Sequence, residues 1–186
     1  MTYIDGITIL ADAVVEPVSL TDAKNWLRIT NYDTDDVLIG DLLSAARVHI
    51  EKLTGCSLVN KSVRINVELT PQSQGFWIID VPYGPLGCVD EVKIKTGMNT
   101  YEVLTKNSDF EVIGGKIWVY TAGIYVIKYQ CGFNTIPEDL ATDILTLTAW
   151  SYENRGKKMN NDPKSRMTEF PSWDGLNYHQ YKKVVI

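Results

Sequence analysis

Three aspartates lie within four residues, Asp33, Asp35 and Asp36, and carboxylates this close together can bind a metal ion or act as acid and base. A calcium loop also needs a glycine at its sharp turn and a distal glutamate, and the sequence has neither at the required positions. The run directly precedes a segment with helical periodicity, where carboxylates are favoured by the helix dipole. We therefore predict that these aspartates stabilise the start of a helix.

Other residues that often carry chemistry are few and scattered. The two histidines, His49 and His179, have no cysteine, histidine or carboxylate at a metal-ligand spacing. The three cysteines, Cys56, Cys88 and Cys131, form no CxxC pair and are read as small apolar residues. Nucleophile-elbow, phosphate-loop and dinucleotide-binding motifs are absent from the sequence. We predict no catalytic residues, no metal site and no cofactor.

Charge and hydropathy limit the classes of partner. The formal net charge is -5 and the pI is near 5.0, which argues against a protein that neutralises many phosphates. The basic cluster that begins at Arg155 and ends at Arg166 is read as a solvated face after a helix, with contact to nucleic-acid phosphates as the alternative. No run approaches the roughly 20 apolar residues of a membrane helix, and the start lacks the pattern of a signal peptide. We expect no membrane partner and an origin in the cytoplasm.

Three helices are predicted on either side of a β region. Ser19 can cap a helix at about 19–28, and apolar residues at i, i+3 and i+4 predict a second helix at about 34–54 that ends before Gly55. In this helix we expect one apolar stripe through Leu38 and Leu42, with Ile39, Leu43 and Ile50 beside it. Pro137 begins a third helix at about 137–155.

The segment at about 57–132 has the signature of β structure. Val63, Ile65, Val67 and Leu69 alternate with polar residues, and β-branched and aromatic runs follow between glycine-containing turns. We predict an α+β fold: a small helical core of three main helices, an inserted antiparallel β region and an extended C-terminal tail. The segment before residue 17 is expected to be a short strand or an arm.

Two sets of residues are predicted to contact other chains. The third helix is apolar on more than one side, which indicates a neighbouring subunit as well as its own domain. The tail is aromatic and aperiodic, so we expect it to order on a partner, with packing onto its own β domain as the alternative. The predicted subunit interface comprises Leu43, Arg47, Ile50, Leu145, Trp150 and Tyr152. The predicted docking residues are Phe170, Trp173, Tyr178, Tyr181, Val184, Val185 and Ile186.

Several stretches, taken together, resemble one protein family. They are PVSLTDAKNWLRI, then DTDDVLIGDLLSAARVHIEKLTGCSLV, then the Gly132-Phe133 turn with Ile136-Pro137 and a helix ending in WSYENRG, with VPYGPL in the middle of the β region. In this order they resemble the head-tail connector (adaptor) proteins of long-tailed bacteriophages and prophages, over roughly residues 16–156. The chain departs from that pattern at Cys56, where a basic residue is common, and in its long aromatic tail.

The resemblance implies a structural protein of the virion neck, made in the host cytoplasm and without enzymatic activity. It implies a homo-oligomeric ring of twelve subunits that joins the portal protein to the next neck or tail-completion protein. DNA would pass through the lumen of this ring without specific binding. In this interpretation residues 1–156 are the connector domain and residues 157–186 are the tail that docks on the portal.

Two other functions are compatible with the sequence. One is a monomeric β-rich binding module of a phage tail, in which Trp77, Trp118 and Trp173 would form a platform. The other is a hydrolase that uses Asp33 or Asp36 with a distant lysine, because such a site converges only in the folded chain.

Overall fold

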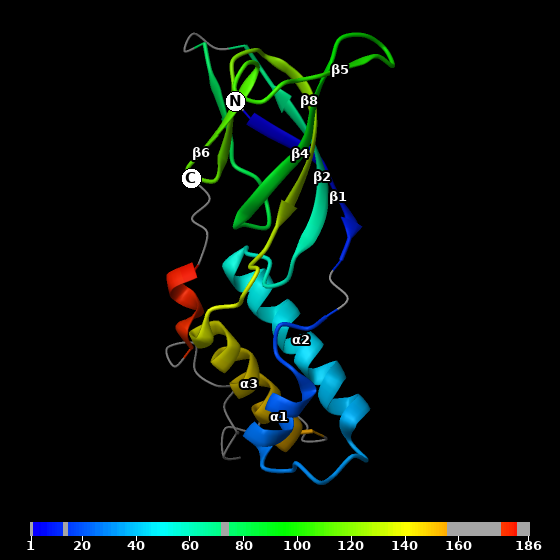
Figure 1. Ribbon diagram of the computed structural model, residues 1–186, viewed down its shortest axis with the longest axis vertical. Helices are drawn as coiled ribbons and strands as arrows, with labels where there is room; N and C mark the ends of the chain where they lie inside the picture. Colours follow the sequence, from blue (N-terminus) through cyan, green and yellow to red (C-terminus); the bar gives the residue numbers. More distant parts are fainter. Residues whose placement is uncertain (1, 13–14, 72–74, 156–175, 182–186) are drawn as a thin grey trace, which may run out of the picture. The chain divides into compact units, whose positions relative to one another are not determined.

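The computed structural model describes residues 2–12, 15–71, 75–155 and 176–181. Its described residues fall into two compact units, each with its own interior (Figure 1). The helical unit comprises the described residues of Val15–Thr54 and Thr135–Ile186. The β unit comprises those of Met1–Val14 and Gly55–Asn134. The predicted α+β class is confirmed, with three main helices and an antiparallel β region between the second and the third.

The helical unit consists of α1 (Leu20–Leu27), α2 (Asp36–Thr54), α3 (Glu138–Glu153) and the short 3-10 helix η2 (Asn177–Tyr181). Ser19 caps α1 as predicted, because its side-chain oxygen accepts a hydrogen bond from the Asp22 amide at 3.1 Å. Gly55 follows α2 with a φ of 70°, a left-handed conformation that favours glycine at the end of a helix. None of the described helices combines the length and the apolar composition of a membrane span.

The buried face of α2 is the stripe beside the one that we expected to dominate. Ile39, Leu43, Ala46 and Ile50 are buried, whereas Leu42 is only partly buried and Leu38 is 36% exposed. Both stripes fit helical periodicity, because apolar residues cover a wide arc of this helix. The choice between them is made by α1 and α3, which pack against α2.

The β unit contains two antiparallel sheets. The larger sheet has the order β1 (Thr2–Ala11), β2 (Lys61–Leu69), β8 (Gly123–Cys131), β4 (Leu86–Lys95) and β5 (Tyr101–Val103). The smaller sheet has the order β3 (Trp77–Ile79), β7 (Lys116–Val119) and β6 (Phe110–Ile113). The N-terminal segment, expected as a short strand or an arm, is a ten-residue strand that pairs with β2 at the edge of the larger sheet.

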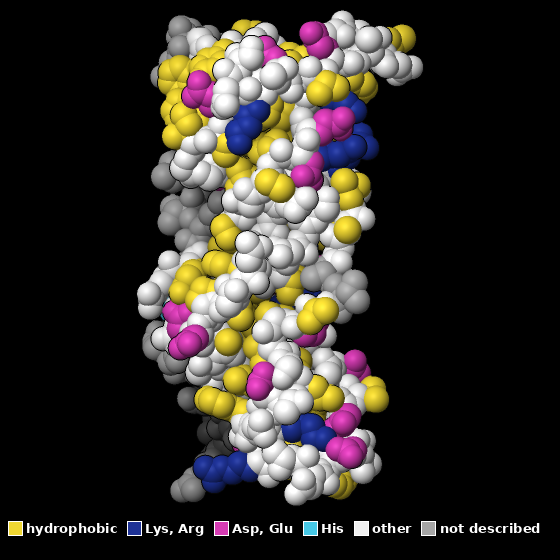
Figure 2. All heavy atoms as spheres, in the orientation of Figure 1, with side chains coloured by type: hydrophobic (Ala, Val, Ile, Leu, Met, Phe, Trp, Pro, Cys, Tyr) yellow, Lys and Arg dark blue, Asp and Glu magenta, His cyan; other side chains and the backbone are white. Residues whose placement is uncertain are grey.

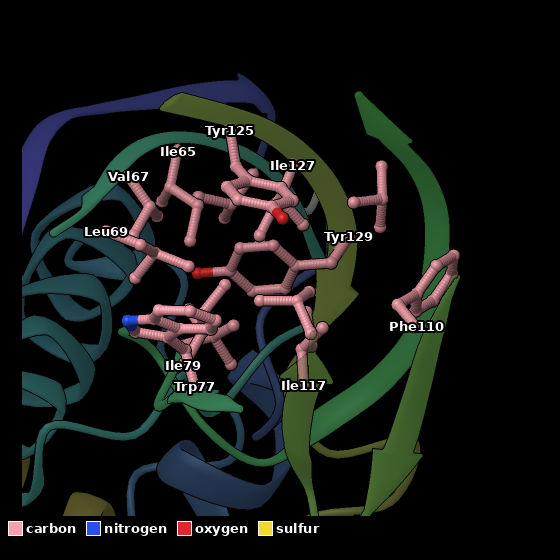
Figure 3. Close-up of a cluster of buried hydrophobic side chains, with 14 of the residues drawn as sticks. Ile65, Val67, Leu69, Trp77, Ile79, Phe110, Ile117, Tyr125, Ile127 and Tyr129 are labelled. Atoms are coloured by element: carbon pink, nitrogen blue, oxygen red, sulfur yellow. The ribbon is translucent and has the colours of Figure 1, made fainter. Parts of the chain in front are cut away.

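The core of the β unit fills the space between its two sheets (Figure 3). Alternation places Val63, Ile65, Val67 and Leu69 on the inner face of β2, as predicted, opposite residues such as Ile79 and Ile117 of the smaller sheet. Trp77 is also part of this core, and its indole Nε1 donates a hydrogen bond to the Thr70 carbonyl at 2.9 Å. The alternative in which Trp77 belongs to an exposed binding platform is therefore wrong.

Truncation of the buried stripe of α2 should cost more stability than truncation of its neighbour. We expect Ile39→Ala to lower the free energy of unfolding by about 2–5 kcal/mol, the usual range for a buried aliphatic side chain. Leu42→Ala should cost less, because a partly exposed side chain loses less buried area and leaves a smaller cavity. Urea unfolding followed by tryptophan fluorescence measures both values. A larger loss for Leu42→Ala would contradict the assignment of the buried face.

Two buried tyrosines should make the β unit sensitive to alkali. The Tyr125 and Tyr129 hydroxyls donate hydrogen bonds to the Thr121 and Pro82 carbonyls, each at 2.6 Å. Burial raises the pKa of Tyr125 from its ordinary value near 10 to about 12, and it also raises the pKa of Tyr129. The stability that depends on neutral Tyr125 is therefore complete below about pH 10 and is lost as the pH rises through 12.

Urea unfolding at several pH values tests this dependence. Tyr125→Phe should be less stable than the parent protein near neutral pH, because it lacks the hydrogen bond, but it should lose less further stability between pH 10 and 12. Tyr101→Phe, which alters an exposed tyrosine of β5, is the matched control and should keep the parent's pH dependence. An identical alkaline slope for Tyr125→Phe and the parent would contradict the assignment.

Candidate interaction surfaces

The acidic run before α2 joins the three main helices to one another. The Lys24 ammonium of α1 contacts both Asp33 and Asp36, and the hydrogen bond that it donates to Asp33 Oδ1 raises the pKa of this lysine. The Tyr152 hydroxyl of α3 donates a hydrogen bond to Asp35 Oδ2 at 2.6 Å. Arg155, just beyond α3, lies 3.5 Å from the same oxygen. These carboxylates are engaged in contacts that stabilise the helical unit.

This arrangement does not favour the hydrolase alternative. The lysine that approaches Asp33 and Asp36 is Lys24, a near neighbour in sequence whose charge they neutralise. Within the described residues, no group of three or more His, Cys, Asp and Glu side chains is placed to hold a metal ion. The geometry of these aspartates therefore supports ion pairing.

Charged groups also gather in a shallow pocket on the open face of the larger sheet. Its volume is about 160 Å³ and it is lined by Arg64, Glu91, Lys93, Tyr101, Val126 and Lys128. The Lys93 and Lys128 ammonium groups lie 2.8 and 3.1 Å from the Glu91 carboxylate, and their hydrogen bonds lower its pKa. Glu91 is thus held in its ionised form and is a poor proton donor near neutral pH.

Leu43 and Ile50 belong to the interior of the helical unit. Both were predicted at the subunit interface, and in the structure both are buried among residues of their own chain. A fully buried side chain has no surface left to bury against a second subunit. The prediction failed to separate these inward positions from outward ones because apolar residues occupy both sides of α2.

The other predicted interface residues are partly exposed. Arg47 donates hydrogen bonds to Glu16 Oε2 at 2.7 Å and to Glu51 Oε2 at 3.1 Å, so its charge is balanced within the helical unit. Leu145, Trp150 and Tyr152 are half-buried on α3. An interface on this helix therefore stays a prediction, and it rests on these partly exposed residues.

Several exposed apolar residues were missed as interface candidates. Trp26 of α1 is 48% exposed and Val37, at the start of α2, is 79% exposed. Tyr32, between the two helices, and Leu38 are exposed as well. These residues lie outside the buried stripes of the helices. The sequence pattern did not show which stripes are buried, so it could not identify these residues as exposed.

The described part of the C-terminal tail packs on the helical unit. The Asp143 carboxylate of α3, which is buried, accepts hydrogen bonds from the Asn177 and Tyr178 amides at 2.8 and 2.9 Å. The Asn177 side chain also donates to Asp143, and the Tyr181 hydroxyl donates to Asp139 at 3.0 Å. Burial raises the pKa of Asp143, whereas the bonds from Asn177 and Tyr178 lower it.

Two of the predicted docking residues, Tyr178 and Tyr181, take part in these contacts with α3. The Tyr178 side chain is buried and Tyr181 is half-buried, so neither is a free anchor in this structure. Residues 176–181 pack on helices, whereas the alternative for the tail was packing on the β domain. The remaining docking residues lie outside the described part of the chain: Phe170, Trp173, Val184, Val185 and Ile186.

Removal of the Asp143 carboxylate should release residues 176–181. Asp143→Ala removes the acceptor of three hydrogen bonds, and we expect the free energy of unfolding to fall by about 1–3 kcal/mol. Amide hydrogen exchange at Asn177 and Tyr178 should become faster. Asp41→Ala, at an exposed position of α2, is the control and should change neither quantity. Unchanged exchange at both amides in Asp143→Ala would contradict this anchoring role.

Comparisons with known proteins add three similar solved structures. One is described as "Virion of native gene transfer agent (GTA) particle"; it is 17% identical, with a TM-score of 0.70 over 97% of this chain and 96% of the other. A second is described as "Neck of empty GTA particle computed with C6 symmetry", with 18% identity and a TM-score of 0.68 over 97% of both chains. A third is described as "Neck of native GTA particle computed with C12 symmetry", with 20% identity and a TM-score of 0.64 over 97% of both chains.

At these identities the likeness establishes the fold. A search of curated proteins finds no match. A family model gives independent support: residues 17–81 match the family described as "Phage gp6-like head-tail connector protein". This match covers α1, α2, β2 and β3 and includes the first two stretches on which the sequence resemblance rests. The resemblance of this chain to the head-tail connector proteins of phages is therefore confirmed, with residues 17–81 matching the gp6-like connector family.

Proposed function

We propose that this protein is a structural, non-enzymatic subunit of the neck of a phage-like particle, where it connects the head to the tail. The observation that carries the proposal is the match of residues 17–81 to the gp6-like connector family. The fold gives further support, because it is shared over nearly the full chain with proteins from particles described by their virion or neck. The carboxylates described above are engaged in structural contacts, which agrees with a role that requires no catalysis.

We infer that the protein acts as a homo-oligomeric ring of twelve subunits. Two of the similar structures come from necks computed with C6 and C12 symmetry, and a cyclic arrangement of identical subunits would suit this chain. Exposed apolar side chains such as Trp26 and Val37 support self-association, because burying them against a neighbour is favourable. On α3, the half-buried residues Leu145, Trp150 and Tyr152 are the proposed contacts, with Arg47 of α2.

The proposed partners at the two ends of the ring are the portal protein and the next neck or tail-completion protein. For portal docking we retain the aromatic and apolar residues of the tail, because aromatic side chains dominate the energetics of interface centres. Tyr178 and Tyr181 have a different proposed role: they hold the tail on α3 through their contacts with the buried interior and with Asp139. The net charge of -5 suits a conduit that lets DNA pass without binding it.

Electron microscopy and sedimentation of the purified protein, alone and mixed with its portal protein, test this function. We expect closed rings, free or bound to the portal. Phe170→Ala and Trp173→Ala should weaken portal binding while the melting transition stays unchanged, because these residues are proposed to contact the partner. A protein that stays monomeric at micromolar concentration with the portal present would contradict the connector function, and it would favour the monomeric binding module.

A further inference from the structure

The edge strand β1 carries apolar side chains that are exposed in the described part of the structure. Ile7 pairs with Ile65 and Ile9 pairs with Val63 across the β1–β2 ladder, so both lie on the inner face of the larger sheet. Ile65 and Val63 are fully buried, yet Ile7 and Ile9 remain 47% and 44% exposed. Ile4, on the same inner face, packs against the core, so it is at Ile7 and Ile9 that the inner apolar face extends beyond the described residues that cover it. We call Ile7 and Ile9 the β1 strip.

The free edge of β1 also lacks several of the features that usually protect an edge strand from pairing with another chain. Natural edge strands are typically short or carry lysine or proline, whereas Thr2–Ala11 is ten residues long and contains no Lys, Arg or Pro. Two register shifts, between Ile4 and Gly6 and between Ile9 and Ala11, flank the strip and leave Ile7–Ile9 in regular pairing with β2. An exposed edge of this kind with apolar side chains is a site for association.

A second set of exposed apolar side chains lies on the outer face of the smaller sheet, beside the charged residues Glu111 and Lys116. Ile78 and Trp118 are opposite each other across β3 and β7, and the Phe76 ring stacks on Trp118 with centroids 5.3 Å apart. Ile78, Ile113 and Tyr120 are 38%, 50% and 46% exposed. We call this surface the outer patch, and it consists of Phe76, Ile78, Ile113, Trp118 and Tyr120.

The strip and the patch lie on different sheets of one unit. Within the β unit, Figure 1 draws the end of β1 on one side and β6 of the smaller sheet on the other. Hydrophobic side chains reach the surface on both of these sides in Figure 2. A two-fold contact joins a surface to itself, so it would leave one of the two surfaces exposed. A head-to-tail contact between identical copies covers both the strip and the patch. When such contacts repeat until the last copy meets the first, they produce a closed ring.

We propose that the β1 strip of one copy packs against the outer patch of the next copy. This proposal rests on the ring proposed above and identifies the surfaces that join its subunits in the β unit. The partner of each surface is a second copy of this chain, because one β unit carries both the strip and the patch that a head-to-tail contact would join. The contact would remove Ile7 and Ile9 from water and shield the free edge of β1.

Exchange of charges across the proposed contact tests it. Ile9→Glu and Ile78→Lys each place a charge opposite apolar side chains in the contact and should raise the dissociation constant for self-association about tenfold or more. The double variant should bind about tenfold more tightly than either single variant, because the two new charges would face each other. Thr8→Glu is the matched control: Thr8 pairs with Arg64, whose side chain is on the open face of the sheet, and it should stay within about twofold of the parent.

Sedimentation velocity of the full chain, with the portal protein where assembly requires it, gives these constants, and circular dichroism melting checks the fold. If Ile9→Glu fails to fold, Ile9→Thr replaces it with the same direction and an effect of about threefold. Single variants that assemble like the parent, or a double variant without recovery, would overturn the strip-to-patch contact while leaving the ring proposal intact. A parent protein that does not self-associate even with the portal would instead overturn the ring itself.

Discussion

The helical unit is built from two stretches of the chain that are separated by residues 55–134. The packing of α3 against α2 joins these two stretches and so holds the unit together. The buried side chains of α2 and α3, such as Ile39, Ile50, Leu140 and Ile144, form the interior of this unit. Contacts between distant parts of the sequence are made only after a long loop has closed, and that closure costs conformational entropy. The bond from Tyr152 to Asp35 adds a polar contact across the same pair of segments.

The polar groups of the helical unit reinforce this packing. Lys24 is nearly buried, and its charge is balanced by two aspartates that come from outside its own helix. Asp143 is buried on α3, and three donors from the C-terminal segment satisfy its carboxylate. Burying an unpaired charge is costly, so each of these groups depends on partners that only the folded unit supplies. The C-terminal segment at 176–181 is in this way part of the helical unit.

The β unit has a closely packed interior, but apolar side chains on its edge strand β1 are exposed. Tyr125, Ile127 and Tyr129 of β8 are almost inaccessible to water between the two sheets (Figure 3). In contrast, β1 extends the larger sheet beyond its cover and leaves Ile7 and Ile9 at the surface. Contiguous exposed apolar side chains favour contact with another protein, since water is excluded on association.

The sequence by itself determined the fold class, the three helices and the alternation of β2, because these depend on local periodicity and on caps such as Ser19 and Gly55. Its ordered motifs also carried the resemblance to head-tail connectors. Tertiary structure decided which stripe of α2 is buried, since two adjacent stripes of this helix are apolar and the packing of α1 and α3 against it distinguishes them. It also decided that Asp143 holds the C-terminal segment and that Ile7 and Ile9 stay uncovered. These outcomes depend on contacts between residues far apart in the chain, and local sequence patterns do not encode the spatial arrangement of such residues.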